Sequence, residues 1–429
     1  MTGRALMIAL VLAAGAGAAA AEEPTSTPRG KLPRETSCFD CHSQLDGTAL
    51  EPTRAIDADV HLQGGIGCHE CHGGDPGAGF DGDPFAAHDE AKGFTGKPAR
   101  LDIPRFCAKC HSDAAYMKRF DPQMRVDQHG EYLTSVHGQR NSAGDEKAAV
   151  CVDCHGAHGI LPPGDPRSSV HASSLADTCS RCHSDAELMR GYGLKANQVE
   201  RYRTSVHAEA LYQKGDLSAP TCNDCHGSHG AVPPGVDSVS NVCGSCHGRE
   251  GSLFREVEAR TGMDLAPCIR CVICHENHAV HRPTEEMLGV GPGSTCTGCH
   301  VEGEEGYRAA DEMARSLKTL RTRLEEATRI LEDAERAGVE VGPDHAELQK
   351  AQNHLVESRV LVHGFDLARF LEASEAGIAV ADEGVAAGHR AFAELRFRRM
   401  GLAASLVVIL GVIIALGLTI RRLEGGGPV

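Results

Sequence analysis

Two patterns of apolar residues with helical spacing occupy the C-terminal part of the chain. The first has positions three and four residues apart, at Met313, Leu317, Leu320, Leu324, Ala327, Leu331 and Ala334. This heptad spacing predicts one apolar face on a helix. Gly338 to Gly342 predicts a turn, and Pro343 suits the first turn of a second helix, which continues the spacing at Leu348, Ala351, Leu355, Ser358, Val362 and Phe365. Residues 304–398 therefore predict an antiparallel helical hairpin, or an oligomeric bundle, that serves as a stalk.

A continuous apolar segment follows the stalk. Met400 to Ile420 is a run of 21 uncharged, mostly aliphatic residues. At about 1.5 Å per residue, such a helix is long enough to cross a hydrocarbon layer of about 30 Å. Arginines at positions typical of a membrane interface argue against the alternative of a buried core helix. They flank the segment on both sides, at Arg396, Arg398, Arg399, Arg421 and Arg422. We predict a single transmembrane helix at 399–421 and a cytoplasmic tail at 422–429.

The N-terminus carries the features of a secretory signal. Arg4 precedes an apolar stretch from Ala5 to Ala20, and small residues lie before Glu22. This pattern predicts a signal peptide at 1–21, with an N-terminal membrane anchor as the alternative. Export would place the following residues in the periplasm, on the outer side of the inner (cytoplasmic) membrane.

Residues 22–303 lack the composition of an ordinary hydrophobic core. The chain has no Trp and only 4% aromatic residues, and its 41% apolar fraction includes 19 Cys. So few large apolar side chains predict that something else fills the interior. The formal net charge of −16 argues against a nucleic-acid binder, which would carry a basic face.

Nine copies of Cys-x-x-Cys-His account for 18 of the 19 cysteines. Two thiols one helical turn apart can add to the two vinyl groups of a haem, and the adjacent imidazole then lies beneath the iron as its proximal ligand. Zinc sites and disulfide frameworks do not require a His after each pair. The predicted attachment cysteines are Cys38, Cys41, Cys68, Cys71, Cys107, Cys110, Cys151, Cys154, Cys179, Cys182, Cys222, Cys225, Cys243, Cys246, Cys271, Cys274, Cys296 and Cys299. The predicted proximal ligands are His42, His72, His111, His155, His183, His226, His247, His275 and His300.

Other histidines can supply the second axial ligands. Eleven remain between His42 and His300 for nine irons, so bis-His ligation is the expected state. The favoured distal ligands are His61, His88, His137, His158, His171, His207, His229 and His278. Three of them follow a proximal His by three residues and are expected to ligate a neighbouring haem: His158, His229 and His278. His69, His129 and His281 are weaker candidates, and His363 becomes one if the C-terminal helices fold back over the haems.

A repeat of 70 to 71 residues organises the motif region. The repeat has two blocks. The first block is Tyr-x-Thr-Ser-Val-His, which ends at His137 in one copy and at His207 in the next. In both copies it is followed by the second block, Cys-x-Asp-Cys-His-Gly-x-His-Gly. A degraded third copy would place Glu258 at the equivalent of these histidines, near the unpaired Cys268. An open or Cys-ligated eighth haem would follow, unless a spare His fills the site and Cys268 is a small buried residue.

These repeated blocks resemble the multihaem c-type cytochromes with doubled Cys-x-x-Cys-His motifs, broadly the cytochrome c3-like group. The resemblance covers residues 38 to 300. The C-terminal helices are also similar to the long helices that follow the haems in hydroxylamine oxidoreductase and pentahaem nitrite reductase relatives. Membership implies a mostly α-helical, loop-rich fold packed around nine covalent c-type haems, in which 22–303 forms the haem domain. It also implies periplasmic electron transfer.

Two functions are consistent with this pattern. The first is a membrane-tethered relay between a quinol-oxidising or cytochrome-b-like membrane subunit and periplasmic cytochromes or a terminal reductase. The alternative is an oxidoreductase that acts on a small nitrogen or sulfur oxyanion at one open haem. The acidic surface favours soluble partners that dock through basic patches. The helical hairpin could also join copies of the chain.

Overall fold

The computed structural model describes residues 33–79, 83, 85–233, 239–262 and 271–424. The secondary structure of these residues is helical, with no strand among them, which confirms the prediction of a mostly α-helical chain with many loops. Two compact units are present, Met1–Ser174 and Leu175–Val429. The second unit thus combines five of the nine motifs with the C-terminal helices. The predicted signal peptide lies outside the described residues.

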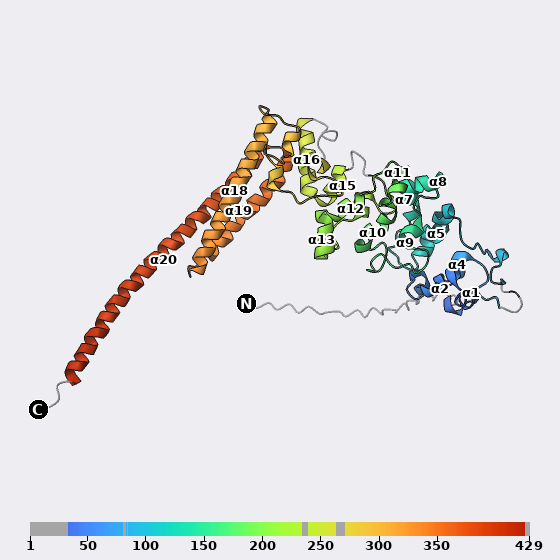
Figure 1. Cartoon of the computed structure of the whole chain (residues 1–429), viewed down its shortest axis with the longest axis horizontal. Coiled ribbons are helices and arrows are strands. Elements are labelled where there is room, and N and C mark those ends of the chain that lie inside the picture. Colours follow the sequence, from blue (N-terminus) through green and yellow to red (C-terminus); the bar gives the residue numbers. More distant parts are fainter. Residues whose placement is uncertain (1–32, 80–82, 84, 234–238, 263–270, 425–429) are drawn as a thin grey trace, which may run out of the picture. The chain divides into compact units, whose positions relative to one another are not determined.

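The first unit consists of short helices joined by loops (Figure 1). Its described residues bury only five apolar side chains, which are Ile56, Pro104, Met117, Ala148 and Val150. Such a small side-chain core matches the deficit expected from composition. The α-helices are α1 Ser37–His42, α2 Glu51–Arg54, α3 Val60–Gln63, α4 Cys68–His72, α5 Ile103–His111, α6 Ala114–Met117, α7 Gln128–Thr134, α8 Val136–Ser142 and α9 Cys151–His155. The 3-10 turns are η1 Pro33–Glu35, η2 Gly47–Ala49, η3 Glu90–Lys92 and η4 Arg100–Asp102.

The motif-bearing part of the second unit also consists mainly of short helices. One small apolar cluster joins Ala176, Val199, Tyr202 and Ala208. The helices are α10 Ala172–His183, which begins at the boundary between the units, α11 Ala186–Gly191, α12 Gln198–Arg203, α13 Val206–Lys214, α14 Cys222–His226, α15 Val239–Cys246, α16 Gly248–Thr261 and α17 Cys271–His275. The 3-10 turns are η5 Glu285–Met287 and η6 Cys296–Gly298.

Three long helices, rather than a two-helix hairpin, form the C-terminal part: α18 Glu305–Arg336, α19 Gly342–Leu361 and α20 Leu367–Glu424 (Figure 1). All seven predicted seam residues of α18 are buried in their shared core. The predicted second helix is too long, because η7 Val362–Gly364 and the left-handed Phe365 (φ 43°) end it and reverse the chain. The residues beyond this break form α20, which packs against both other helices.

Glycines allow the close approach of α20 to its neighbours. Gly377, Gly384 and Gly388 all lie within this helix without interrupting it. A Cβ on Gly388 would lie 2.5 Å from the side chain of Ile330, and one on Gly377 would lie 2.9 Å from Leu320. Close packing thus explains why these helical positions lack a side chain.

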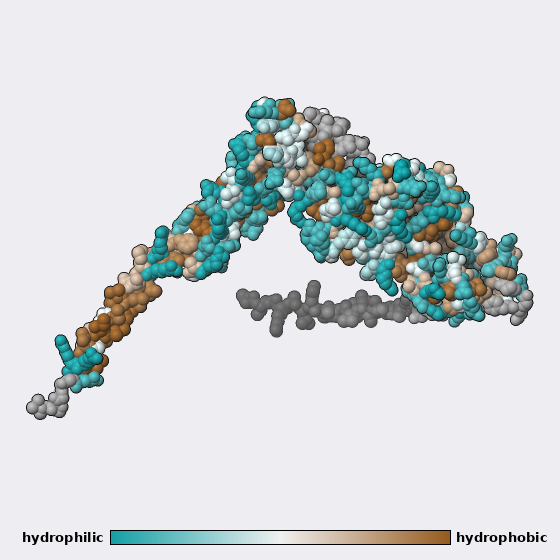
Figure 2. Space-filling model, viewed as in Figure 1, coloured by the Kyte–Doolittle hydropathy of each residue, from teal (hydrophilic) through white to brown (hydrophobic). Residues whose placement is uncertain are grey.

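The C-terminal half of α20 is long and apolar enough to cross a membrane. Its most apolar 18-residue window has a mean hydropathy of 2.7, and none of that window is buried. Figure 2 shows the corresponding apolar band near the C-terminal end of the helix. The large apolar side chains from Met400 to Ile420 are all exposed, which agrees with a segment that contacts lipid.

Candidate haem-ligand pairs

Helix ends carry eight of the nine motifs. Seven helices, α1, α4, α5, α9, α10, α14 and α17, end on the motif's histidine, and α15 ends one residue before His247. In a helix the two cysteines of each motif lie three residues apart, on one face, which is the arrangement that attachment to one haem requires. The ninth motif differs because its first three residues form the 3-10 turn η6.

The repeated Ser-Val-His block sets the start of a helix. Ser135 and Ser205 are buried N-caps whose hydroxyls accept hydrogen bonds from the N–H groups of Gly138 (2.9 Å) and Ala208 (3.1 Å). Ser is a favoured N-cap because its oxygen satisfies a free N–H of the first turn. The cap makes the predicted ligands His137 and His207 the second residues of α8 and α13.

The second block of the repeat fixes the motif helices at both ends. Asp153 and Asp224 accept a hydrogen bond from the backbone N–H three residues earlier, each at 2.7 Å. Gly156 and Gly227 follow the proximal histidines with φ of 82° and 86°, a conformation that favours glycine. In the degraded third copy Glu276 takes this position with φ 62°.

Six motif histidines each face a second histidine from another part of the chain. The ring centroids are 6.1 Å apart for His42 and His88, 5.9 Å for His111 and His61, and 6.2 Å for His72 and His158. In the second unit they are 6.5 Å apart for His247 and His207, 5.9 Å for His226 and His278, and 6.1 Å for His275 and His363.

These separations fit two imidazoles on opposite sides of one iron. Two metal–nitrogen bonds of about 2 Å, plus about 1 Å from each nitrogen to its ring centre, give a centroid separation of about 6 Å. Among the described residues, no three side chains of His, Cys, Asp or Glu converge on one point. A haem iron needs only two axial side chains, because the porphyrin supplies its other ligands. The pairs therefore fit a haem.

In several pairs the other ring nitrogen faces an oxygen acceptor. Nδ1 of His42, His72 and His226 lies 3.1, 2.8 and 3.1 Å from the carbonyl oxygens of Ala49, Gly96 and Val232. Nδ1 of His363 lies 2.9 Å from the carbonyl oxygen of Val360. A hydrogen bond at Nδ1 fixes the tautomer that leaves Nε2 available to a metal.

Asp59 gives one of the paired histidines a carboxylate partner. Its Oδ1 lies 3.2 Å from Nδ1 of His61 and accepts the N–H of that residue, while Oδ2 accepts the N–H of Ile160 at 3.0 Å. Burial alone would raise the pKa of Asp59, but these hydrogen bonds outweigh it and lower the pKa to about 2. His61 thus has an ionised acceptor, which increases the donor strength of an imidazole. Sequence reasoning missed this residue, although it lies only two positions before His61.

The turn that carries His363 is attached to α16. Arg260 donates hydrogen bonds to the carbonyl oxygen of Gly364 (2.9 Å) and to Asp366 (3.2 Å). Phe254 of α16 contacts Phe365 edge-on, and Leu253 belongs to the bundle core. The helical bundle thus does more than join the motifs to the apolar segment, because it also brings an imidazole to His275.

The other predicted ligands have different surroundings. His137, His155, His183 and His229 all make contacts, and their ligand roles stay predictions. His171 is buried, and its Nδ1 lies 2.7 Å from the hydroxyl of Ser173. The ligand role of His171 also stays a prediction. Of the spare histidines, His69 lies 3.2 Å from Glu70 and His281 lies 3.9 Å from Glu276.

Of the two residues on which the predicted open haem depends, the structure describes Glu258. Glu258 is half-buried in the last turns of α16, whereas His137 and His207 lie at capped helix starts, so the structure does not reproduce the proposed alignment at this point. Cys268 lies outside the described residues.

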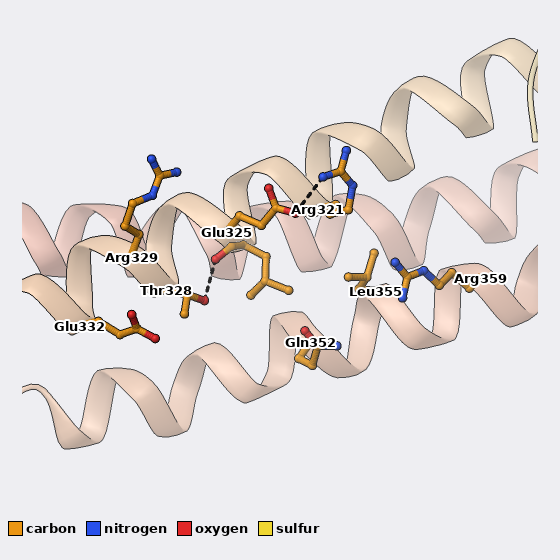
Figure 3. Close-up of a pocket in the computed structure, with 9 residues that line it drawn as sticks. Arg321, Glu325, Thr328, Arg329, Glu332, Gln352, Leu355 and Arg359 are labelled. Carbon is orange, nitrogen blue, oxygen red and sulfur yellow. Dashed lines mark hydrogen bonds and ion pairs between the residues drawn. The ribbon is translucent and has the colours of Figure 1, made fainter. Parts of the chain in front are cut away.

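A shallow groove of about 470 Å³ runs between α18 and α19 (Figure 3). Arg321 lies within it, 2.7 Å from Glu325, and also pairs with Glu285 at 2.9 Å. No His or Cys lines this groove, so it is separate from the histidine pairs.

Comparison with protein families, with curated proteins and with solved structures finds no match for this chain.

Proposed function

We propose that this chain is a membrane-anchored nonahaem c-type cytochrome that relays electrons in respiration. The observation that carries the proposal is the set of six histidine pairs, each joining a Cys-x-x-Cys-His histidine to a histidine elsewhere in the chain at 5.9 to 6.5 Å. A zinc site or a disulfide framework gives no reason for paired imidazoles at this separation. Covalent haem explains both the cysteine spacing and the pairs.

Mainly bis-His ligation favours electron transfer over substrate chemistry. An iron with two protein ligands has no free position, and bis-His iron has a lower potential than His/Met iron. Here the protein would set the spacing, ligation and potential of the haems, while the iron supplies the electron chemistry.

The pairs also support close contact between haems whose motifs are not consecutive in the sequence. His158 follows His155 by three residues, but its ring faces His72. His278 follows His275 in the same way and faces His226. One short segment would therefore hold two haems, which connects the second motif with the fourth and the sixth motif with the eighth.

The apolar half of α20 would anchor the protein in the inner membrane, with the haems in the periplasm. Between Leu367 and Met400 the helix extends for about 50 Å, at about 1.5 Å per residue. His363 precedes this stretch, so the eighth haem would lie far from the apolar segment along the helix. A quinol-oxidising or cytochrome-b-like partner would reach this haem through a domain outside the membrane.

The alternative function, an oxidoreductase acting on an oxyanion at an open eighth haem, loses its main argument. His363 faces His275, so a second imidazole is available to that iron.

The haem content of the detergent-solubilised protein tests the proposal. We expect nine haems per chain in a pyridine haemochrome assay and mostly low-spin signals in electron paramagnetic resonance of the oxidised form. Zinc with no haem would contradict the proposal. Detergent pull-down of the tagged protein should return an integral-membrane redox partner.

A further inference from the structure

The ninth motif has a local structure of its own. Its cysteines belong to the 3-10 turn η6 and the residue after it, and His300 is separated from the start of α18 by only four residues. His300 is also half-exposed, with 45% of its side chain accessible. By contrast, a second histidine faces three other motif histidines of this unit, which are His226, His247 and His275.

The contacts of His300 involve α18 and its cap. Nδ1 of His300 lies 3.5 Å from Oε2 of Glu304, and the same oxygen accepts the N–H of Val301 at 3.1 Å. Gly306 provides the space for the ring, because a Cβ there would lie 2.3 Å from Cε1 of His300. The carboxylate and the glycine together hold the imidazole against the first turn of α18.

No second imidazole faces His300 among the described residues of Leu175–Val429. The ring contacts of His300 include no other histidine, and the remaining histidines of this unit have other surroundings: His229 has a contact of its own, His281 lies beside Glu276, His345 lies beside Glu335, His354 packs against Gly377, and His389 is exposed on α20. All histidines of the unit are among the described residues. The one that the turn of the bundle supplies, His363, faces His275.

We propose that the ninth haem keeps a free axial position and binds a neutral, diatomic-sized ligand that accepts electron density from ferrous iron. This inference rests on the proposed function, since it requires a haem at Cys296 and Cys299. The carboxylate of Glu304 behind His300 would strengthen the imidazole as a donor, which favours such a ligand on the opposite side of the iron.

The charge around this site disfavours an anion. Glu302, Glu304 and Glu305 are exposed within four residues of one another, and Arg308 is the basic side chain in the following turn. Their net negative charge would repel an oxyanion such as nitrite in proportion to its charge and would leave a neutral ligand unaffected. The site thus differs from the oxyanion-binding haem that the sequence suggested at the eighth motif.

The test counts carbon monoxide molecules bound by the reduced full-length protein, with the haem content measured on the same sample. We expect nine haems and one carbon monoxide per chain. The double variant Cys296→Ser/Cys299→Ser should retain eight haems and bind none. Nine haems with no carbon monoxide bound would overturn the inference but leave the proposed function intact. A haem content that this double variant does not lower would instead contradict haem attachment at the ninth motif.

Met287 provides the control for a competing ligand. Its carbonyl oxygen accepts hydrogen bonds from the N–H and the hydroxyl of Thr295, both at 3.0 Å, so it is the methionine next to this motif. Met287→Leu should leave the uptake at one molecule. If uptake rises from none to one in this variant, methionine caps the ninth iron and the inference is wrong.

Two further measurements test the charge argument and the role of Glu304. Azide should bind the oxidised protein more tightly as ionic strength increases, because salt screens the repulsion, whereas binding of neutral imidazole should not change. Azide affinity that falls with salt would contradict the preference for a neutral ligand. Glu304→Gln should lower the iron–histidine stretching frequency in resonance Raman spectra of the reduced protein before carbon monoxide is added, while carbon monoxide uptake stays at one molecule per chain. An unchanged frequency would exclude Glu304 as a positioning residue.

Discussion

His363 lies opposite His275, with ring centroids 6.1 Å apart and ring planes 18° apart. The first belongs to the turn between α19 and α20, and the second ends α17. The bundle and the motif region would therefore share the eighth haem. Loss of the eighth haem would therefore remove a link between the bundle and the motif region. Loss of the turn that carries His363 would have the same effect.

Replacing His363 tests this link. In His363→Ala we expect one additional high-spin haem in electron paramagnetic resonance and one additional carbon monoxide bound after reduction, because the eighth iron loses its second imidazole. His389→Ala, which changes an exposed histidine on α20, is the matched control and should behave as the wild type. An unchanged spin state in His363→Ala would show that another group ligates this iron.

The local parts of the site could be predicted from the sequence, since short-range rules govern them. The Cys-x-x-Cys-His spacing, the Ser caps before His137 and His207 and the seam of α18 all follow from residues within a few turns of one another. Which histidine faces which motif depends instead on how distant segments pack. The sequence makes His363 a candidate only if the C-terminal helices fold back, and nothing near it in sequence indicates His275. The break after Leu361 meets that condition because it returns the chain to α16.

The carboxylate behind His61 should affect the potential of the third haem. Asp59→Asn keeps a side chain that can cap α3 but removes the negative charge next to Nδ1 of His61. A less electron-rich imidazole stabilises ferrous iron, so we expect a rise on the order of tens of millivolts, small beside the about 0.8 V that changes of axial ligand cover. Spectroelectrochemical titration would show one haem shifted. Asp57→Asn is the control, because Asp57 forms an exposed ion pair with Arg34, and it should leave all haem potentials unchanged. A fall in the potential of the third haem in Asp59→Asn would contradict the argument.

The glycine after the sixth motif should resist substitution. Gly227 has a φ of 86°, and a Cβ would lie 3.3 Å from the carbonyl oxygen of Gly230. Gly227→Ala should destabilise the protein by about 1–3 kcal/mol, as measured by thermal unfolding, because φ 86° with ψ 153° is a backbone conformation that essentially only glycine adopts. Glu276 already has positive φ at the equivalent position and pairs with Arg201 at 2.9 Å. Glu276→Ala should therefore cost at most about 1 kcal/mol, and equal losses for the two variants would rule out backbone strain as the cause.

Close packing in the bundle gives the last prediction. Gly388 lies on α20 where a Cβ would be 2.5 Å from Cγ2 and 2.8 Å from Cγ1 of Ile330. Since Ile330 is β-branched and cannot easily turn away, Gly388→Ala should overpack the contact and cost about 1–3 kcal/mol. Gly401→Ala is the control, because it adds the same methyl group to the same helix with no atom within 4 Å. It should leave the free energy of unfolding unchanged or raise it, since Ala favours the helix more than Gly does. Chemical denaturation followed by circular dichroism compares the two, and a Gly388→Ala variant as stable as Gly401→Ala would mean that α20 does not pack this closely on α18.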